Sequence, residues 1–247
     1  MRISFCTTCA NRLHQFERTF AANLDVVATQ PETEWVILNF GSRDGLDEFI
    51  TARLSQLPSR VIYARALSNP PWHLSVAKNT AHRVASGDVL FNLDCDNFIN
   101  NACAVIRHHF ADGVQVLHLW SGTFGDGTCG RVAIARDSFY ALGGYDEAFD
   151  PMAYQDRDLL HRAAAKRFKV RHVRTLNEVA IPNDKVESVR YCANDGRTWN
   201  DFVKWNRERS LINIRSGRLT ANEGNDWGTV PLEILRGGTM STQSEPL

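Results

Sequence analysis

The first 97 residues alternate between short apolar runs of strand length and longer segments with apolar residues three or four positions apart. The apolar runs occupy residues 3–8, 35–40, 60–64 and 89–93. Helical spacing is clearest after the first run, at Leu13, Phe16, Phe20, Leu24 and Val27. Further helices are expected through Phe49, Ile50, Leu54 and Leu57 and over residues 74–85. Strands that alternate with helices are typical of a parallel sheet with right-handed crossovers.

The second half of the chain departs from this alternation. Strand-like runs at residues 114–120 and 131–135 flank a glycine-rich stretch, and a predicted helix over residues 154–168 precedes a short strand at 169–173. This order favours a mixed sheet. A last helix is predicted over residues 198–214, where one stripe turns from apolar to polar through Trp199, Phe202, Val203, Asn206, Ser210 and Asn213. Residues 237–247 lack periodicity and are expected to fray.

The fourth predicted strand ends in two carboxylates, Asp94 and Asp96, separated by one residue. Alternate residues of a strand leave on the same side, so both carboxylates are expected to point together. Ligands of parallel sheets bind beyond the carboxyl ends of the strands, and hard oxygen ligands there suit a divalent cation. The pattern predicts a metal at this edge, although a short acidic motif also occurs on solvated loops.

Composition and charge exclude several classes of protein. A chain of 247 residues with 43% hydrophobic residues can bury a sizeable core, which fits one large α/β domain or a domain plus a small appendage. Basic and acidic residues balance at 28 each, so no basic field would hold nucleic acid. No apolar stretch approaches the roughly 18 residues of a membrane span. We expect a soluble, cytoplasmic protein with no transmembrane segment, and peripheral membrane association stays open.

Six cysteines are scattered along the chain, at Cys6, Cys9, Cys95, Cys103, Cys129 and Cys192. This distribution does not suit a disulfide scaffold in a chain of this length. Cys6 and Cys9 have the spacing of a redox pair or of half a zinc site. No second pair follows at zinc spacing and Cys6 lies within a strand, so a structural role is favoured.

Five segments in order resemble the GT-A glycosyltransferases, in particular family 2 with a galactosyltransferase-like acceptor half. They are residues 3–8 with Asn11 and Arg12, residues 41–44, residues 77–79 with 85–88, the pair Asp94 and Asp96, and residues 143–147 with 155–159. The resemblance covers residues 3–173. It implies a Rossmann-like α/β/α sandwich with a mixed central sheet and a C-terminal helical extension.

The resemblance also implies a domain plan. Residues 1–175 would form the catalytic domain, with a nucleotide-sugar half over residues 1–97 and an acceptor half over residues 98–175. Residues 176–236 would form an extension on the acceptor side, and 237–247 a flexible tail.

The implied reaction is transfer of a sugar, as by a hexosyltransferase, from a nucleoside-diphosphate-sugar to a hydroxyl. The acceptor could be a saccharide, a lipid-linked glycan, a protein or a small molecule. Mn²⁺ or Mg²⁺ would be held by Asp94 and Asp96 and would stabilise the charge of the departing diphosphate. His172, Asn183 and Asp184 are candidates for a further metal ligand, with His172 carried forward. A lone histidine on a strand is more often hydrogen-bonded in the core.

The resemblance places the donor nucleotide along the ends of the first strands. The implied donor-binding residues are Thr7, Thr8, Asn11, Arg12, Asn39, Asp44, Lys78, Asp94, Gly143 and Gly144. Asn39 stands where the family usually has an acid, which leaves the base open, although UDP is the usual carrier. Lys78 stands where the family more often has Arg, and a cation there suits a diphosphate. The two glycines would allow close approach to a sugar.

Asp156, in the first turn of the helix predicted over residues 154–168, is the expected general base of an inverting reaction. The residue before it is Gln155, where the family usually has Glu. Two alternatives stay open. A nucleotidyltransferase would also use paired carboxylates, but it would carry a glycine-rich phosphate loop after the first strand, where Asn11, Arg12 and Leu13 stand. A sugar-binding domain without turnover is the other, and Gln155 is its main support.

Overall fold

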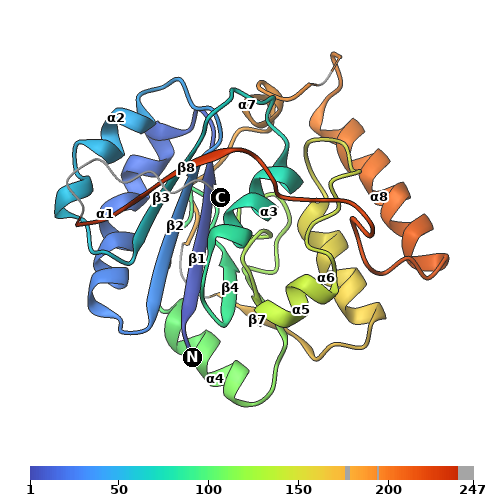
Figure 1. Cartoon of the computed structure of the whole chain (residues 1–247). Helices are drawn as coiled ribbons and strands as arrows, with labels where there is room; N and C mark the ends of the chain where they lie inside the picture. The colour runs from blue at the N-terminus through green and yellow to red at the C-terminus, as the bar shows by residue number, and fades with distance from the viewer. Residues whose placement is uncertain (176–178, 194, 239–247) are drawn as a thin grey trace.

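The computed structural model describes residues 1–175, 179–193 and 195–238. It confirms a mixed sheet with helices on both faces (Figure 1). The sheet has eight strands in the order β7-β5-β6-β4-β1-β2-β3-β8. The predicted tail lies outside the described residues from 239 onward.

Four parallel strands form the N-terminal half of the sheet. They are β1 (Ile3–Cys9), β2 (Thr33–Asn39), β3 (Val61–Ala66) and β4 (Val89–Asn92). β1 lies between β2 and β4, so the direction of strand addition reverses beside it. Ligands of open α/β sheets bind at such a reversal.

The remaining strands extend the sheet at both edges. β6 (Val132–Ala135) runs antiparallel to β4, and β5 (Val116–Trp120) lies between β6 and β7 (Val170–Arg174). β8 (Leu232–Arg236) pairs antiparallel with β3. The sequence pattern did not predict β8, because a run of five residues carries little periodicity. Its place is fixed by pairing, including an ion pair between Glu233 and Arg65 at 2.7 Å.

Helices cover the two faces of the sheet. One face carries α1 (Leu13–Thr29), α2 (Leu46–Thr51), the 3₁₀ turn η1 (Leu54–Gln56) and α4 (Ala102–Ala111). The other carries α3 (Leu74–Val84), α5 (Arg136–Ala141) and α6 (Gln155–Ala165). Each set encloses its own buried apolar cluster against the sheet, as expected of an α/β/α sandwich.

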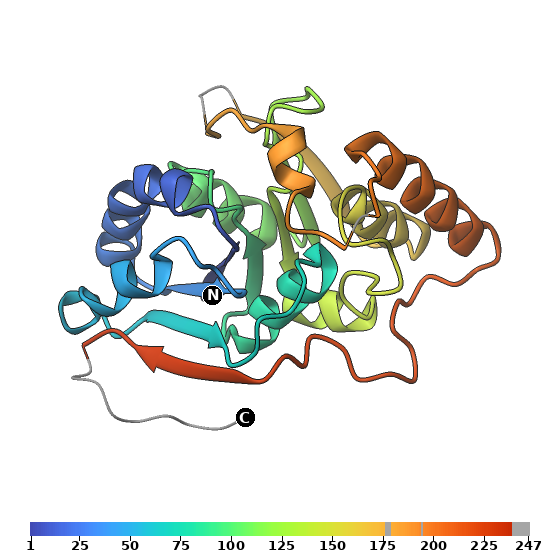
Figure 2. The ribbon, with the colours of Figure 1, turned by 90° about the horizontal axis from the view of Figure 1, so that it is seen from above.

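The C-terminal segment reaches both sides of the molecule. α7 (Lys185–Val189) and α8 (Trp199–Arg215) pack near the loop before α6, where Ala153, Val189 and Phe202 form a small cluster. A capping box between Thr198 and Asp201 starts α8, close to the predicted boundary. The chain then returns along the sheet to add β8 at the far edge (Figure 2). Residues 176–236 thus contain β8 at the sheet edge as well as α7 and α8.

The six cysteines are all free. Cys6 belongs to the apolar cluster on one face of the sheet and Cys9 to the cluster on the other. Residues three apart on a strand point to opposite faces, so these two thiols do not form a pair. No helix among the described residues is long and apolar enough to cross a membrane.

His82 of α3 links the fold to pH. Its ring is buried, stacks on Phe139 with 4.8 Å between ring centres, and leaves Nε2 without a hydrogen-bond partner. Burial lowers the pKa of His82 to about 3. The unfolded chain takes up this proton below its ordinary pKa of about 6.5 and the folded protein does not, so stability falls as pH drops from there towards 3.

We expect His82→Phe to flatten this dependence. The ring keeps its stacking but cannot titrate, so the slope of unfolding free energy against pH should decrease by up to about 1.4 kcal/mol per pH unit between pH 6 and 4. Urea unfolding at several pH values measures both slopes. The two proteins should have the same slope above pH 7.5, and equal slopes below pH 6 would refute the assignment.

Candidate active site

A cavity of about 430 Å³, named the acidic cavity below, opens at the carboxyl ends of β1 and β4. Its wall brings together Thr8, Arg12, Lys78, Asp94, Asp96 and Asp156. The strand-end residues Thr8, Asp94 and Asp96 thus meet the start of α6 at one place, beside the reversal of strand order.

Asp94 and Asp96 both line the acidic cavity but differ in environment. The Asp96 side chain is buried and accepts from Asn97 Nδ2 at 2.6 Å and Asn183 Nδ2 at 3.3 Å. Burial, with the charge of Asp94 adding to it, raises the pKa of the Asp96 carboxyl to about 6. Two carboxylates this close in a partly buried site favour a bound cation, which would stabilise both charges.

Lys78 connects the acidic pair to Asp156. Its ammonium lies 2.7 Å from Asp156 Oδ1 and 3.4 Å from Asp94 Oδ1, and the side chain is 1% exposed. Burial alone would lower the pKa of Lys78, but the two carboxylates outweigh it and the pKa is raised. Lys78, which the resemblance assigns to the donor diphosphate, therefore already lies between two carboxylates of the protein.

Asp156 lies in the first turn of α6, as predicted. Burial raises the pKa of its carboxyl, and Lys78 offsets this only in part because Asp94 acts in the opposite direction. A carboxylate with a raised pKa at a cavity wall can accept a proton from a bound hydroxyl. Asp158, two residues further along α6, is fully buried and pairs with Arg162 at 2.6 Å.

The loop that leads into α6 is held by Asn206 of α8. Its amide nitrogen donates to the carbonyl oxygens of Asp150, Met152 and Ala153, and its oxygen accepts from Asp150 N at 2.8 Å. Ala153 and Tyr154 both have positive φ, 70° and 72°, which is unfavourable for residues with side chains. The polar stripe noted in the sequence therefore fixes a strained turn just before Asp156.

We expect Asn206→Ala to lower the free energy of unfolding by about 2–4 kcal/mol, because it strands buried carbonyl oxygens and frees the strained turn. Urea unfolding measures the loss. Arg207→Ala, at an exposed position of the same helix, is the matched control and should change stability by less than about 0.5 kcal/mol. A small effect of Asn206→Ala would show that the turn is stable without it.

The donor set suits a hard divalent cation. Carboxylate oxygens of Asp94 and Asp96 face one cavity. Asn183 donates to Asp96 through its amide nitrogen, and its oxygen accepts from Arg12 at 3.0 Å, so it does not offer an oxygen ligand here. Asp184 instead caps α7 through Val186 N at 2.8 Å. His172 lies on the edge strand β7, 3.2 Å from His118 Nδ1, and does not line the cavity. Among the described residues, His172 is thus paired with another histidine rather than with the acidic pair.

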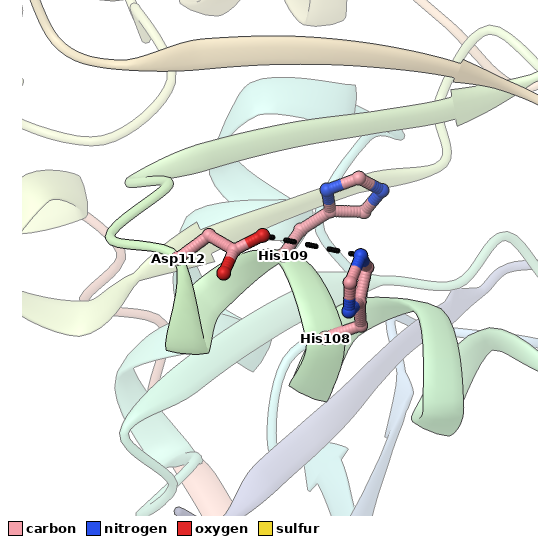
Figure 3. A group of neighbouring side chains, drawn as sticks. All are labelled: His108, His109 and Asp112. Atoms are coloured by element: carbon pink, nitrogen blue, oxygen red, sulfur yellow. Dashed lines mark ion pairs between the residues drawn. The ribbon is translucent and has the colours of Figure 1, made fainter.

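One compact group of ligand-type side chains lies elsewhere on the described surface. His108, His109 and Asp112 gather at the end of α4, with 3.9 Å between His108 Nε2 and Asp112 Oδ2 (Figure 3). The histidines occupy the last turn of the helix, where their rings can interact with the helix dipole. This group is separate from the acidic cavity.

The residues after β1 divide between internal and cavity positions. Thr8 and Arg12 line the acidic cavity, whereas Thr7 is buried and accepts from Trp35 Nε1 at 2.9 Å. Arg12 pairs with Glu187 at 2.8 Å and also donates to Asn183. Arg12 thus fastens α7 to the start of α1 beside the cavity.

A second cavity of about 460 Å³, named the outer cavity below, adjoins the acidic cavity and shares Trp72 and Tyr191 with it. Asn11 and Asp44 line it. Asp44 also accepts from Leu13 N at 2.6 Å at the start of α1. Asn39 lines neither cavity, because its amide bonds Tyr63 Oη and Ser42 N within the protein.

Gly143 and Gly144 also lie away from both cavities. A Cβ on Gly143 would lie 1.9 Å from the carbonyl oxygen of Ala221, and one on Gly144 would lie 2.7 Å from the Trp227 ring. Both residues have positive φ. The close approach that requires glycine here is made within the protein, by the C-terminal segment at both positions and also by Asn79 of α3 at Gly144.

Several residues of the cavity wall were not predicted. They come from the glycine-rich loop and the C-terminal segment: Phe124, Tyr154, Arg157, Lys185, Glu187 and Trp199. The cationic and aromatic residues among them carry no motif, and only the fold brings them to the cavity. Trp72, between β3 and α3, also lines the cavity.

Comparison with known proteins gives a family for part of the chain and a fold for the whole. Residues 4–116 match the model of glycosyl transferase family 2. No curated protein sequence matches the chain.

Three solved structures share the fold at low sequence identity. A mannosyltransferase from Pyrobaculum calidifontis, in complex with GDP-Man and Mn²⁺, has a TM-score of 0.59 and 14% identity over 89% of this chain and 72% of its own. TarS of S. aureus with UDP-GlcNAc has a TM-score of 0.59 and 14% identity, over 90% and 68%. A mutant Drosophila β-1,4-galactosyltransferase 7 with manganese, UDP-Gal and xylobiose has 0.55 and 10%, over 85% and 79%.

These likenesses agree with the arrangement of the site. The matched segment contains β1 to β4 and ends at the first residue of β5, so it includes the strand ends that carry Thr8, Asp94 and Asp96. The structural matches extend the same architecture over the second half. Residues 4–116 thus match glycosyl transferase family 2, and the chain as a whole shares the fold of these glycosyltransferase structures.

Proposed function

We propose that the protein transfers a sugar from a nucleoside-diphosphate-sugar, with UDP as the first carrier to test, to a hydroxyl of an acceptor. One observation carries the proposal: Asp94, Asp96 and Asp156 line a single cavity, and the buried ammonium of Lys78 bridges Asp94 and Asp156. Lys78 thus fixes the position of the proposed base, Asp156, relative to Asp94 of the proposed metal site.

Asp94 and Asp96 would hold Mn²⁺ or Mg²⁺ together with the donor diphosphate. The cation would supply electrostatic stabilisation of the charge that develops on the departing diphosphate. Residues 1–97 would contribute the donor side and residues 98–175 the acceptor side. The outer cavity, which adjoins through Trp72, is the place we assign to the nucleoside.

Asp156 would act as the general base. Its carboxylate takes the proton of the acceptor hydroxyl while the hydroxyl oxygen bonds to the anomeric carbon. The bond from that carbon to the phosphate oxygen breaks, and its electron pair leaves with the nucleoside diphosphate. Attack opposite to the leaving group inverts the configuration. Lys78 keeps Oδ1 of Asp156 fixed at 2.7 Å.

Gln155 does not weaken this assignment. Its side chain is 1% exposed, its nitrogen donates to Asp150 O at 3.1 Å, and it does not line the cavity. A glutamate at this position would point into the protein and add no carboxylate to the cavity wall. The reading as a binding domain without turnover therefore loses its main sequence support.

The decisive experiment incubates the protein with a panel of nucleotide sugars and Mn²⁺, with and without acceptors, and identifies the released product. Release of nucleoside diphosphate supports transfer. Release of pyrophosphate would indicate a nucleotidyltransferase, and donor binding without release would indicate a binding domain.

A further inference from the structure

The basic residues around the acidic cavity differ in whether they form ion pairs. Arg12 pairs with Glu187, and Lys78 is shared between Asp94 and Asp156. Two further cations line the same cavity, Arg157 and Lys185. In the part of the chain that the structure describes, neither forms an ion pair with an acidic side chain.

Aromatic rings hold Arg157 instead. Its guanidinium carbon lies 4.6 Å from the ring centre of Phe124 and 4.6 Å from that of Tyr154. Stacking of this kind orients the planar group and leaves its charge uncompensated. The N–H groups along its edge stay available, and they match the paired oxygens of a carboxylate or phosphate.

Lys185, at the start of α7, is arranged in the same way. Its ammonium lies 4.5 Å from the ring centre of Trp199, and both residues line the cavity. Two cations from different elements, each supported by aromatic rings, thus face one space. A wall of this composition suits a ligand that has sugar faces for the rings and a negative charge for the cations.

We propose that Arg157 and Lys185 form an anion subsite for the acceptor, which is a glycan bearing a carboxylate or phosphate group. The inference rests on the proposed function, since it takes the acidic cavity as the place of transfer. Arg157 directly follows the proposed base Asp156 on α6. An acceptor whose hydroxyl meets Asp156 would bring its own substituents to this guanidinium.

The donor diphosphate is the other anion in such a site. It belongs with Asp94 and Asp96 at the end of β4, where a cation joins it to the protein. Arg157 and its ring partners come from α6, the turn before it, and the loop between β5 and β6. The anion bound at Arg157 is therefore a part of the acceptor.

The test is binding of the full-length protein, without donor, to an array of neutral, uronate-bearing and phosphorylated glycans. We expect the anionic glycans to be retained and their neutral counterparts not. Arg157→Gln should weaken this binding at least tenfold, and Arg157→Lys should restore it only in part because the fork of donors is lost. Arg207→Gln, an exposed arginine of α8, is the control and should bind like the wild type.

Three results would overturn the inference. The first is equal retention of neutral and anionic glycans, and the second is unchanged glycan binding by Arg157→Gln. The third is a tenfold loss of affinity for UDP or GDP with Mn²⁺ in Arg157→Gln while glycan binding persists, which would assign Arg157 to the donor. The array contains no donor, so glycan binding can be measured even in a protein that releases no nucleoside diphosphate. The proposed transfer reaction and the proposed anion subsite can therefore fail independently.

Discussion

Asp156→Asn is expected to bind the nucleotide-sugar donor as the wild type does and to lower turnover by about a hundredfold or more, a usual effect of losing a general base. The amide has nearly the same shape and can still face Lys78, but it cannot take the acceptor's proton. Burial and Asp94 already raise the pKa of the carboxyl, which makes it a stronger base than an exposed aspartate.

The measurement is a pair of titrations, kcat from diphosphate release and donor affinity by calorimetry. Asp137→Asn is a matched control, because Asp137 is also in the first turn of a helix, α5, but is exposed and outside both cavities. Turnover of Asp156→Asn equal to that of the wild type would remove the base assignment. A parallel loss of donor affinity would indicate that Asp156 serves the donor instead.

Asp96→Asn is expected to abolish metal-dependent donor binding. The substitution keeps the volume and removes one of two carboxylates that would hold the cation. It also removes a charge that is costly in the metal-free protein, so stability without metal should be unchanged or slightly higher. In the wild type, the proton on Asp96 competes with the cation below pH 6 or so. Apparent Mn²⁺ affinity should then fall by up to about tenfold per pH unit.

Calorimetry with donor and Mn²⁺, at pH 7.5 and pH 5, tests both statements. Asp25→Asn is the control, since Asp25 is an exposed aspartate of α1 that lines neither cavity. Full donor affinity in Asp96→Asn would place the cation elsewhere. A pH dependence that persists in this variant would show that another group causes it.

The first half of the fold follows from the sequence, because each strand and helix there has its own period. The predicted helix at residues 13–27 and the strand at 89–93 match α1 and β4 within a few residues. Elements with weak local pattern were not predicted. α4 combines apolar residues with His108 and His109 and lacks a capping side chain, and β8 depends on pairing with β3 from a distant part of the chain.

The sequence predicts those parts of the candidate site in which an acidic residue stands at the end of a predicted strand or the start of a predicted helix. Asp94, Asp96 and Asp156 are placed at one cavity by strand ends and a helix start. The role of Lys78 was not readable, because its partners lie on two other elements. Gly143 and Gly144 illustrate the same limit. A close approach was predicted there, but it was assigned to a sugar, because the segment around Ala221 that crowds Gly143 is nearly 80 residues away.

The pairing of β8 with β3 has a consequence for synthesis on the ribosome. The hydrogen-bonding edge of β3 has no partner until residues 232–236 have emerged, although β1 to β4 can already align. An open strand edge invites pairing with other chains. During synthesis there is therefore an interval in which β1 to β4 can be aligned while the edge of β3 is open to pairing with another chain. Pairing of β8 with β3 ends that interval.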